Sequence, residues 1–158
     1  MAYTFVTVWY IQAPLDAVCD VICESMAWPQ WWPNVERVEE LIPCDVHGLG
    51  GVRRYTWHGR LPYRFSFDVR VVHFVPLRVI EGHAKGDLEG VGRWLFSVDG
   101  DVTIVRYEWR IRITSVWLRL LARFARPLIR WNHNAVMQQG GEALALKVKA
   151  SSLRVMHL

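Results

Sequence analysis

The stretch WLRLLARFARPLIRWNHNAVMQQGG, residues 117–141, carries the pattern that decides how this chain folds. Its arginines, at intervals of four, three and four residues, are Arg119, Arg123, Arg126 and Arg130. On an α-helix this spacing places them on one stripe, here called the arginine stripe, with leucine, phenylalanine and tryptophan around the rest. The stretch predicts an amphipathic helix that either lies on a membrane or an acidic partner, or covers a sheet of its own domain.

The helical pattern extends beyond the quoted stretch at both ends. Pro127 lacks a backbone N–H donor, so we expect a bent helix or two segments, about 115–126 and 128–150. Gly140 and Gly141 need not end the helix, because good helix formers follow them.

Alternating apolar and polar residues precede the helix and predict β-strands. The expected strands cover about 3–12, 35–42, 51–60, 63–75, 77–85, 88–98 and 101–113, and two short helices follow the first strand. Short connections rich in glycine and proline indicate that neighbouring strands are antiparallel. This order predicts a single α+β domain over residues 1–158, with a curved antiparallel sheet of about seven strands around a long C-terminal helix.

One face of the predicted sheet is apolar and the other is charged. Tyr107 and Trp109 alternate with Arg110, so the two aromatic side chains should face the helix. Gly90 and Gly92 fall on the same face as Trp94, where they leave space for close packing or for a cavity.

The composition is that of a globular protein. Of the 158 residues, 52% are hydrophobic and 22% are charged, which excludes a disordered chain. The net charge of +4 is small and most arginines are interleaved with acids, so we expect no nucleic-acid partner. Nine tryptophans indicate surfaces that are part apolar and part wet, such as a cavity wall or an interface.

The cysteines and the N-terminus indicate in which cellular compartment the protein is expected. Cys19, Cys23 and Cys44 are expected to be buried free thiols, since their spacing matches neither a metal site nor an obvious pair. The N-terminus begins in a strand-like pattern without the features of a signal peptide, which favours a cytoplasmic protein. No metal or cofactor is expected, and the longest apolar runs are far shorter than the roughly 20 residues that span a bilayer.

Three segments resemble the START-like superfamily, also called SRPBCC, and within it the polyketide cyclase/dehydrase-like proteins. They are APLDAVCDVICESMAWPQWWPNV at 13–35, GDLEGVGRW at 86–94 and RWNHNAVMQQG at 130–140, and the resemblance covers nearly the whole chain. It implies a helix-grip fold with a cavity between the sheet and the C-terminal helix. Members of this superfamily bind lipids, sterols, plant hormones or polyketides there, and some are cyclases or aromatases.

Candidate site residues come from the strands and from the final helix. Asn132 can point towards the sheet as a hydrogen-bond anchor, and His133 is a candidate acid or base because imidazole titrates near neutral pH. Alternatively, both side chains fix the helix to backbone groups of the sheet or of the bend. The predicted ligand-binding residues are Trp57, Phe67, Trp94, Tyr107, Trp109, Leu128, Asn132 and Val136.

Three functions remain open from the sequence. The first is binding of a hydrophobic or aromatic small molecule, lipid-like or polyketide-like, in the predicted cavity. The second is a polyketide cyclase or dehydratase that uses His133 or a strand histidine as base. The third is peripheral contact with a membrane or a partner through the arginine stripe, although any attraction to a membrane is expected to be weak because a solvated helix face needs the same residues.

Overall fold

The computed structural model describes residues 2–61 and 63–158, without the side chains of residues 118, 121, 122 and 125. Its elements are β1 (Ala2–Ile11), α1 (Leu15–Cys23), the 3-10 helix η1 (Ser25–Gln30), β2 (Val35–Ile42), β3 (Val52–His58), β4 (Arg64–Val75), β5 (Val79–Gly86), β6 (Leu88–Asp99), β7 (Val102–Ile113), α2 (Val116–Lys147) and β8 (Leu153–His157). The expected element types and their order are confirmed up to the end of α2.

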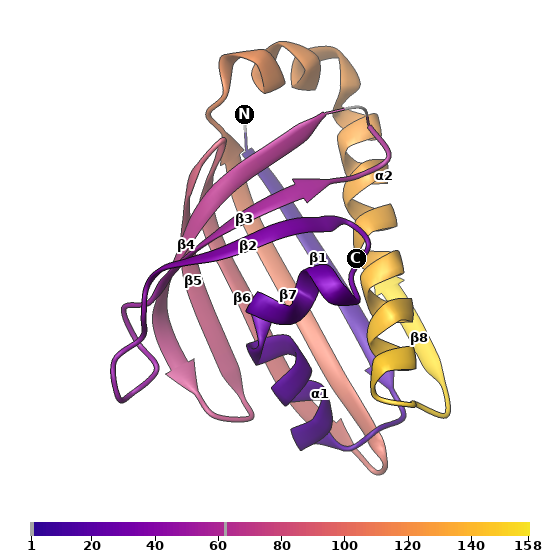
Figure 1. The fold of residues 1–158 in the computed structure, drawn as a ribbon. Coiled ribbons are helices and arrows are strands. Elements are labelled where there is room, and N and C mark those ends of the chain that lie inside the picture. The colour runs from indigo at the N-terminus through magenta and orange to yellow at the C-terminus, as the bar shows by residue number, and fades with distance from the viewer. Residues whose placement is uncertain (1, 62) are drawn as a thin grey trace.

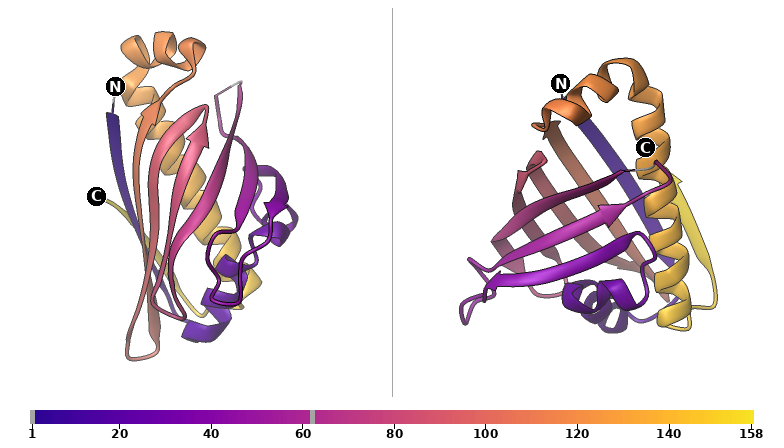
Figure 2. Two further views of the ribbon diagram at one scale, coloured as in Figure 1. Left: turned by 90° about the vertical axis from the view of Figure 1, so that its left-hand side faces the viewer. Right: turned by 45° about the horizontal axis from the view of Figure 1, so that its top comes forward.

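The strands form one antiparallel sheet in the order β2-β3-β4-β5-β6-β7-β1-β8. The sheet is curved and unclosed, and α2 lies in the opening between its two ends (Figures 1 and 2). The predicted α+β class and the sheet around a long C-terminal helix are therefore confirmed.

The end of the chain corrects two expectations. The helix ends at Lys147 rather than near residue 150, and Lys149 takes a positive φ of 56° where the chain turns back. The last residues form β8, which pairs antiparallel with β1, so the sheet has eight strands instead of about seven. The five residues of β8 are too few to show a clear alternation, which is why the sequence pattern missed them.

The bend at Pro127 divides α2 into two parts that point in different directions. α2 is one continuous helix with the proline inside it, as one of the two expectations had it. Figure 1 shows its first part lying across the top of the molecule and the longer second part running down beside the sheet. A proline inside a helix removes one hydrogen bond and crowds the carbonyl four residues earlier, which accounts for the bend.

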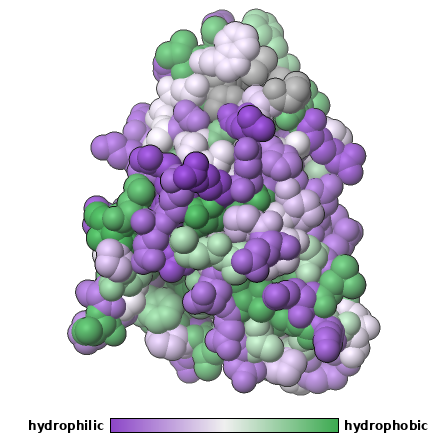
Figure 3. Space-filling view, viewed as in Figure 1, coloured by the Kyte–Doolittle hydropathy of each residue, from purple (hydrophilic) through white to green (hydrophobic). Residues whose placement is uncertain are grey.

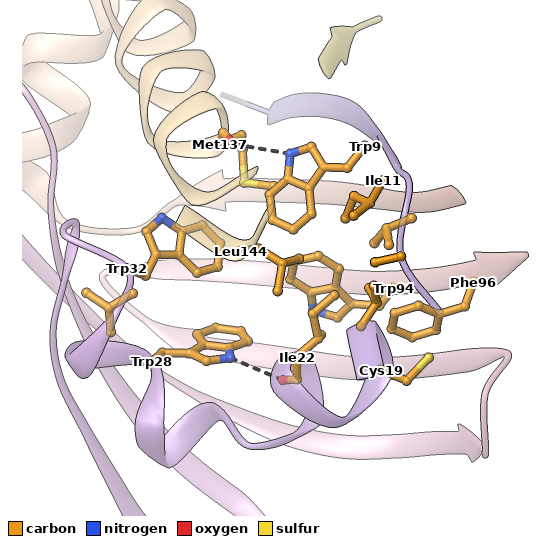
Figure 4. Close-up of a cluster of buried hydrophobic side chains, with 14 of the residues drawn as sticks. Trp9, Ile11, Cys19, Ile22, Trp28, Trp32, Trp94, Phe96, Met137 and Leu144 are labelled. Atoms are coloured by element: carbon orange, nitrogen blue, oxygen red, sulfur yellow. Dashed lines mark hydrogen bonds between the residues drawn. The ribbon is translucent and has the colours of Figure 1, made fainter. Parts of the chain in front are cut away.

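The second part of α2 packs on a cluster of tryptophans, shown in Figure 4. The indole N–H of Trp9 donates to the carbonyl of Met137 at 3.1 Å, and that of Trp32 donates to the carbonyl of Val136 at 3.2 Å. A carbonyl oxygen has two lone pairs, so each accepts an indole proton in addition to its bond within the helix. The rings of Trp9 and Trp32 are therefore buried against the helix with their N–H groups paired.

The glycine pair of α2 allows this close approach. A Cβ atom at Gly140 would lie 2.4 Å from the indole of Trp32, and one at Gly141 would lie 2.8 Å from the indole nitrogen of Trp9. Larger residues would push the rings away from the helix backbone. The pair is thus a packing feature inside the helix, which continues beyond it as expected.

The cysteines depart in part from expectation. All three are free, but only Cys19 is buried, whereas Cys23 and Cys44 are exposed. Cys23 lies at the last residue of α1 and Cys44 in the β2–β3 connection, where the turn of the chain leaves them open to solvent. Among the described residues, no helix is long and apolar enough to cross a membrane.

Candidate ligand-binding site

Two adjoining cavities lie between the concave face of the sheet and the helices. The first, here called the helix cavity, has a volume of about 100 Å³ and contacts α2 through Ile129, Asn132, His133, Val136 and Met137. The second, the strand cavity, has a volume of about 260 Å³ and extends under β3, β4 and β5 towards α1. Both are lined by the same six aromatic side chains, here called the aromatic partition: Trp28, Trp57, Phe67, Trp94, Tyr107 and Trp109.

Alternation along the strands places five residues of the aromatic partition, and Trp28 comes from η1. Tyr107 and Trp109 share one face of β7, and Trp94 lies directly across from Tyr107 on β6, with ring centroids 4.2 Å apart. Gly92 is the cross-strand partner of Trp109, and a Cβ atom there would come within 2.9 Å of the indole ring. Because Gly92 has no side chain, the indole of Trp109 can lie flat across the sheet at this point. This is the space that the glycines on this face predicted.

The helix cavity brings together most of the residues predicted from the sequence. It is lined by Trp57, Phe67, Trp94, Tyr107, Trp109, Asn132 and Val136, together with the candidate base His133.

Leu128 is the exception, and its expected orientation is corrected. Its side chain is 44% exposed and does not line the cavity, whereas the neighbouring Ile129 does. Leu128 lies about 80° around the helix from Val136, which points into the cavity, so it falls at the edge of the inward face.

Sequence reasoning did not assign several lining residues to the site. They are Phe5, Phe65, Leu88, Ile111, Ile113, Ile129 and Met137 in the helix cavity and Ser25, Arg53 and Tyr55 in the strand cavity. The continued alternation of Ile111 and Ile113 with Tyr107 and Trp109 is a signal that would have found two of them. No local pattern marks Arg53, because its neighbour Arg54 has the same charge and faces away.

Asn132 holds the β3–β4 connection. Its Oδ1 accepts the backbone N–H groups of Arg60 at 2.7 Å and Leu61 at 3.3 Å. A Cβ atom at Gly59 would lie 2.1 Å from this oxygen, so only glycine permits the approach. The guanidinium of Arg60 also lies over the ring of Trp131, 5.6 Å from its centroid. The amide oxygen of Asn132 is thus occupied by the fold, which is the second of the two roles considered for it.

His133 presents unpaired polar atoms to the helix cavity. Its ring stacks on Phe5, with centroids 4.1 Å apart, and neither of its buried nitrogens has a hydrogen-bond partner among the described residues. Burial lowers the pKa of His133 to about 3, although the nearby Asn134 side chain acts in the opposite direction. The imidazole is therefore neutral at physiological pH, with one nitrogen donating and one accepting.

Two further polar side chains of the aromatic partition face the cavities. The indole N–H of Trp57 is buried without a partner among the described residues. Burial raises the pKa of Tyr107 well above its usual range, so its hydroxyl stays protonated. A buried donor without a partner costs about 1–3 kcal/mol, which a ligand atom of the right kind would recover.

A single guanidinium marks the far end of the strand cavity. Arg53 donates to Ser25 Oγ at 2.7 Å and to the carbonyl of Cys23 at 3.4 Å, and Ser25 Oγ shares a hydrogen bond of 2.8 Å with the hydroxyl of Tyr55. Among the residues that the structure describes, no carboxylate forms an ion pair with Arg53. Its positive charge is thus free to attract an acceptor group in the cavity.

The strand histidines that were considered as a base lie outside both cavities. His58, His73 and His83 are exposed and line neither cavity, which corrects the possibility of a strand histidine acting inside the fold. Within the described part of the chain, no group of His, Cys, Asp or Glu is arranged to hold a metal ion.

A curved, unclosed antiparallel sheet around a long C-terminal helix is the helix-grip fold seen in START-like proteins, as the sequence segments implied. Solved structures with this fold match nearly the whole chain. The Zhui aromatase/cyclase from Streptomyces sp. R1128 has 17% identity and a TM-score of 0.76 over 94% of each chain. A START superfamily protein from Mycobacterium smegmatis has 14% identity and a TM-score of 0.69 over 94% of this chain and 96% of that one.

A further match is a two-domain protein. The di-domain aromatase/cyclase BexL from the BE-7585A biosynthetic pathway has 19% identity and a TM-score of 0.74, and the match covers 96% of this chain and 51% of BexL. No model of a known protein family matches the sequence, and no curated protein matches it either. At these identities the comparisons establish the fold.

Proposed function

We propose that this protein binds a hydrophobic or aromatic small molecule, lipid-like or polyketide-like, in the space between its sheet and α2. The observation that carries the proposal is an aromatic-walled hollow into which His133 and Trp57 present buried polar atoms without partners. Apolar walls favour an apolar ligand by about 25 cal/mol for each Å² removed from water. The unpaired nitrogens favour a ligand that also carries hydrogen-bonding oxygen atoms.

The two cavity volumes set the size of the ligand. Sites for drug-sized molecules measure about 300–1,000 Å³, whereas the cavities measure about 100 and 260 Å³. A ligand of that class has to occupy both cavities, which requires a side chain of the aromatic partition to turn aside. Trp57 is the best candidate, because its indole N–H has no bond to lose.

Polar groups at opposite ends of the joined space give the ligand a direction. His133 lies at the α2 end, and Arg53 with Ser25 and Tyr55 lies at the far end. A planar or chain-like molecule with a carboxylate or an enolate at one end and a carbonyl at the other fits these groups. Fused-ring polyketides have this chemistry, and two of the matching structures are aromatase/cyclases by name.

The enzymatic alternative has weaker support. A general base works best when its pKa is near the operating pH, and burial lowers the pKa of His133 to about 3. A neutral imidazole with so low a pKa suits a hydrogen-bonding role better than proton abstraction. Binding is therefore the function that the site supports best.

A ligand panel with cavity-filling variants tests the proposal. Native mass spectrometry of the purified protein, tryptophan fluorescence and thermal shifts would be measured with palmitate, anthracene and anthracene-2-carboxylate. Val136→Trp, which fills the helix cavity, should weaken binding at least tenfold. Leu128→Trp places the same ring on the same helix at a half-exposed position outside the cavity and should leave binding unchanged. The proposal fails if no panel member binds and no ligand co-purifies, or if both variants behave alike.

The role of Arg53 is tested by a neighbouring arginine on the same strand. Arg53→Gln should weaken anthracene-2-carboxylate about tenfold while leaving anthracene unaffected, because only the acid gains from the charge. Arg54→Gln is the matched control, since Arg54 points to the outer face and pairs with Asp68 at 2.7 Å. Equal losses for both ligands, or equal losses in both variants, would remove Arg53 from ligand recognition.

A further inference from the structure

The first part of α2 carries an apolar stripe that faces solvent. Val116, Trp117, Leu120 and Phe124, here called the outer stripe, recur at helical spacing and are all exposed, Phe124 by 87%. The amphipathic pattern predicted apolar residues towards the sheet and arginines towards solvent. In the structure an apolar stripe also faces solvent, beside the arginine stripe.

The arginine stripe borders the outer stripe along one side. Arg126 and Arg130 reach back to β1, where they lie over the rings of Tyr3 and Phe5 at 5.3 and 5.0 Å. Arg119 and Arg123 are exposed, and their guanidinium groups have no partner among the residues that the structure describes. They are left to interact with groups outside the chain.

The charge of this region is unbalanced. No Asp or Glu occurs between Glu108 and Glu142, so the whole first part of α2 is positive. It projects beyond the end of the sheet in Figure 1, and Figure 3 shows hydrophobic side chains gathered at that end with hydrophilic ones beside them. A contiguous exposed apolar patch rimmed by charged residues marks an interaction site.

We propose that the first part of α2 docks on an anionic lipid membrane. Trp117, Leu120 and Phe124 then enter the boundary between headgroups and acyl chains, and Arg119 and Arg123 bind the headgroup phosphates. Helices that lie in this boundary combine bulky apolar or aromatic residues on one side with Lys or Arg on another.

Two other occupants fit less well. A second copy of this chain, packed face to face on the outer stripe, would bring two positive arginine stripes together, and like charges across an interface are costly. An acidic protein would match the arginines but would need a pocket deep enough for a ring as exposed as Phe124. A bilayer accepts such a ring at any position.

The docking is independent of what the cavities bind, but its location matters for them. Leu88, the first residue of β6, and Ile113, the last residue of β7, both line the helix cavity. Ile113 precedes the outer stripe by only a few residues, and the β6–β7 hairpin separates Leu88 from it. Docking through the outer stripe therefore turns this end of the cavity towards the bilayer. A lipid-like ligand would have a short path between the two.

Vesicle co-sedimentation of the ligand-free protein tests the docking. Binding is expected to vesicles of phosphatidylcholine mixed with phosphatidylglycerol, to weaken with added salt, and to be much lower for phosphatidylcholine alone. The double variant Arg119→Gln/Arg123→Gln should bind about 30-fold more weakly, because each arginine near an anionic surface strengthens binding about fivefold. Phe124→Ser should also weaken binding at least fivefold.

A matched control removes the same charge elsewhere. Arg78→Gln/Arg110→Gln lowers the net charge equally, at exposed positions away from α2, and should keep nearly full binding. Equal loss in both double variants would reduce the effect to net charge and overturn the proposal. So would equal binding to both kinds of vesicle, or the absence of binding at low salt.

Two further outcomes separate this proposal from its alternatives. Sedimentation velocity that shows a dimer lost in Phe124→Ser would assign the outer stripe to a second copy of the chain. Val136→Trp should lose the small molecule while keeping vesicle binding. A failure of the cavity function and a failure of docking are therefore distinguishable.

Discussion

The two parts of α2 on either side of Pro127 have similar amphipathic sequences but opposite environments. After the bend, Val136, Met137 and Leu144 are buried against the tryptophan cluster. Before it, Trp117 and Phe124 project into solvent. The difference teaches that amphipathic spacing decides only that a helix has distinct faces. Which face is covered depends on whether the sheet extends far enough to meet it.

The stability of the fold should be concentrated in the second part. Its glycine pair lets Trp9 and Trp32 pack on the backbone and donate to helix carbonyls, whereas the four side chains of the outer stripe are 57–87% exposed. Segments with few buried contacts open locally at low free-energy cost. We therefore expect that a partner can cover the outer stripe without unfolding the domain.

Replacing one tryptophan by alanine at each part of α2 tests the contrast most directly. Trp32 packs on the second part, and Trp117 belongs to the first. Trp32 is 1% exposed and Trp117 is 67% exposed. Trp32→Ala should lower the free energy of unfolding by about 3–5 kcal/mol, the cost of removing a large buried ring. Trp117→Ala should change it by less than about 0.5 kcal/mol. Urea denaturation measures both, and similar losses would contradict the contrast between the two parts.

A pH series sharpens the comparison at the junction of the two parts. The pKa of His133 is about 3 in the folded protein against 6.5 for an unperturbed histidine. As the pH falls below 6.5 the unfolded chain takes up a proton that the folded chain does not, so stability is lost by about 1.4 kcal/mol per pH unit until pH 3. At pH 4 the contribution should amount to about 3 kcal/mol.

The variant His133→Phe isolates this contribution. It keeps a flat ring against Phe5 and removes two unpaired nitrogens, so at pH 7 it should be as stable as the parent or more so. The difference between the two unfolding curves should grow in favour of the variant from pH 7 to pH 4. A constant difference would mean that His133 is protonated normally in the folded protein.

A smaller effect tests how the helix holds the β3–β4 connection. Asn132→Ala removes the acceptor of the Arg60 and Leu61 N–H groups and should lower the free energy of unfolding by about 1–2 kcal/mol. Hydrogen exchange at these two amides should accelerate, while exchange in β6 and β7 stays unchanged. Unchanged exchange at Arg60 and Leu61 would show that other contacts hold the connection.

The strands were the most predictable part of the molecule. Alternation along β7 placed Tyr107 and Trp109 inside and Arg110 outside, because successive side chains of a strand point to opposite faces. The orientation of Leu128 was not predictable in the same way. A helix turns by about 100° per residue, so Leu128 lies about 80° around from Val136, at an edge of the inward face where packing decides.

The polar residues of the site were also predictable only in part. The position of Asn132 and His133 on an inward face follows from helical spacing. Their partners do not, because Asn132 meets a connection 71 and 72 residues away, and His133 meets Phe5 of the first strand. Arg53 was missed since its role depends on the burial of Ser25 and Tyr55 beside it.

The sequence by itself determined the order of the elements, the apolar face of the sheet, the bend at Pro127 and the concentration of aromatic residues on the strands. These are local properties, set by residue spacing and by backbone chemistry. The tertiary structure alone decided that the hollow is divided by the aromatic partition, that β8 completes the sheet, and that the outer stripe is left uncovered. Those features depend on which distant segments meet, and sequence spacing does not specify the distances between them.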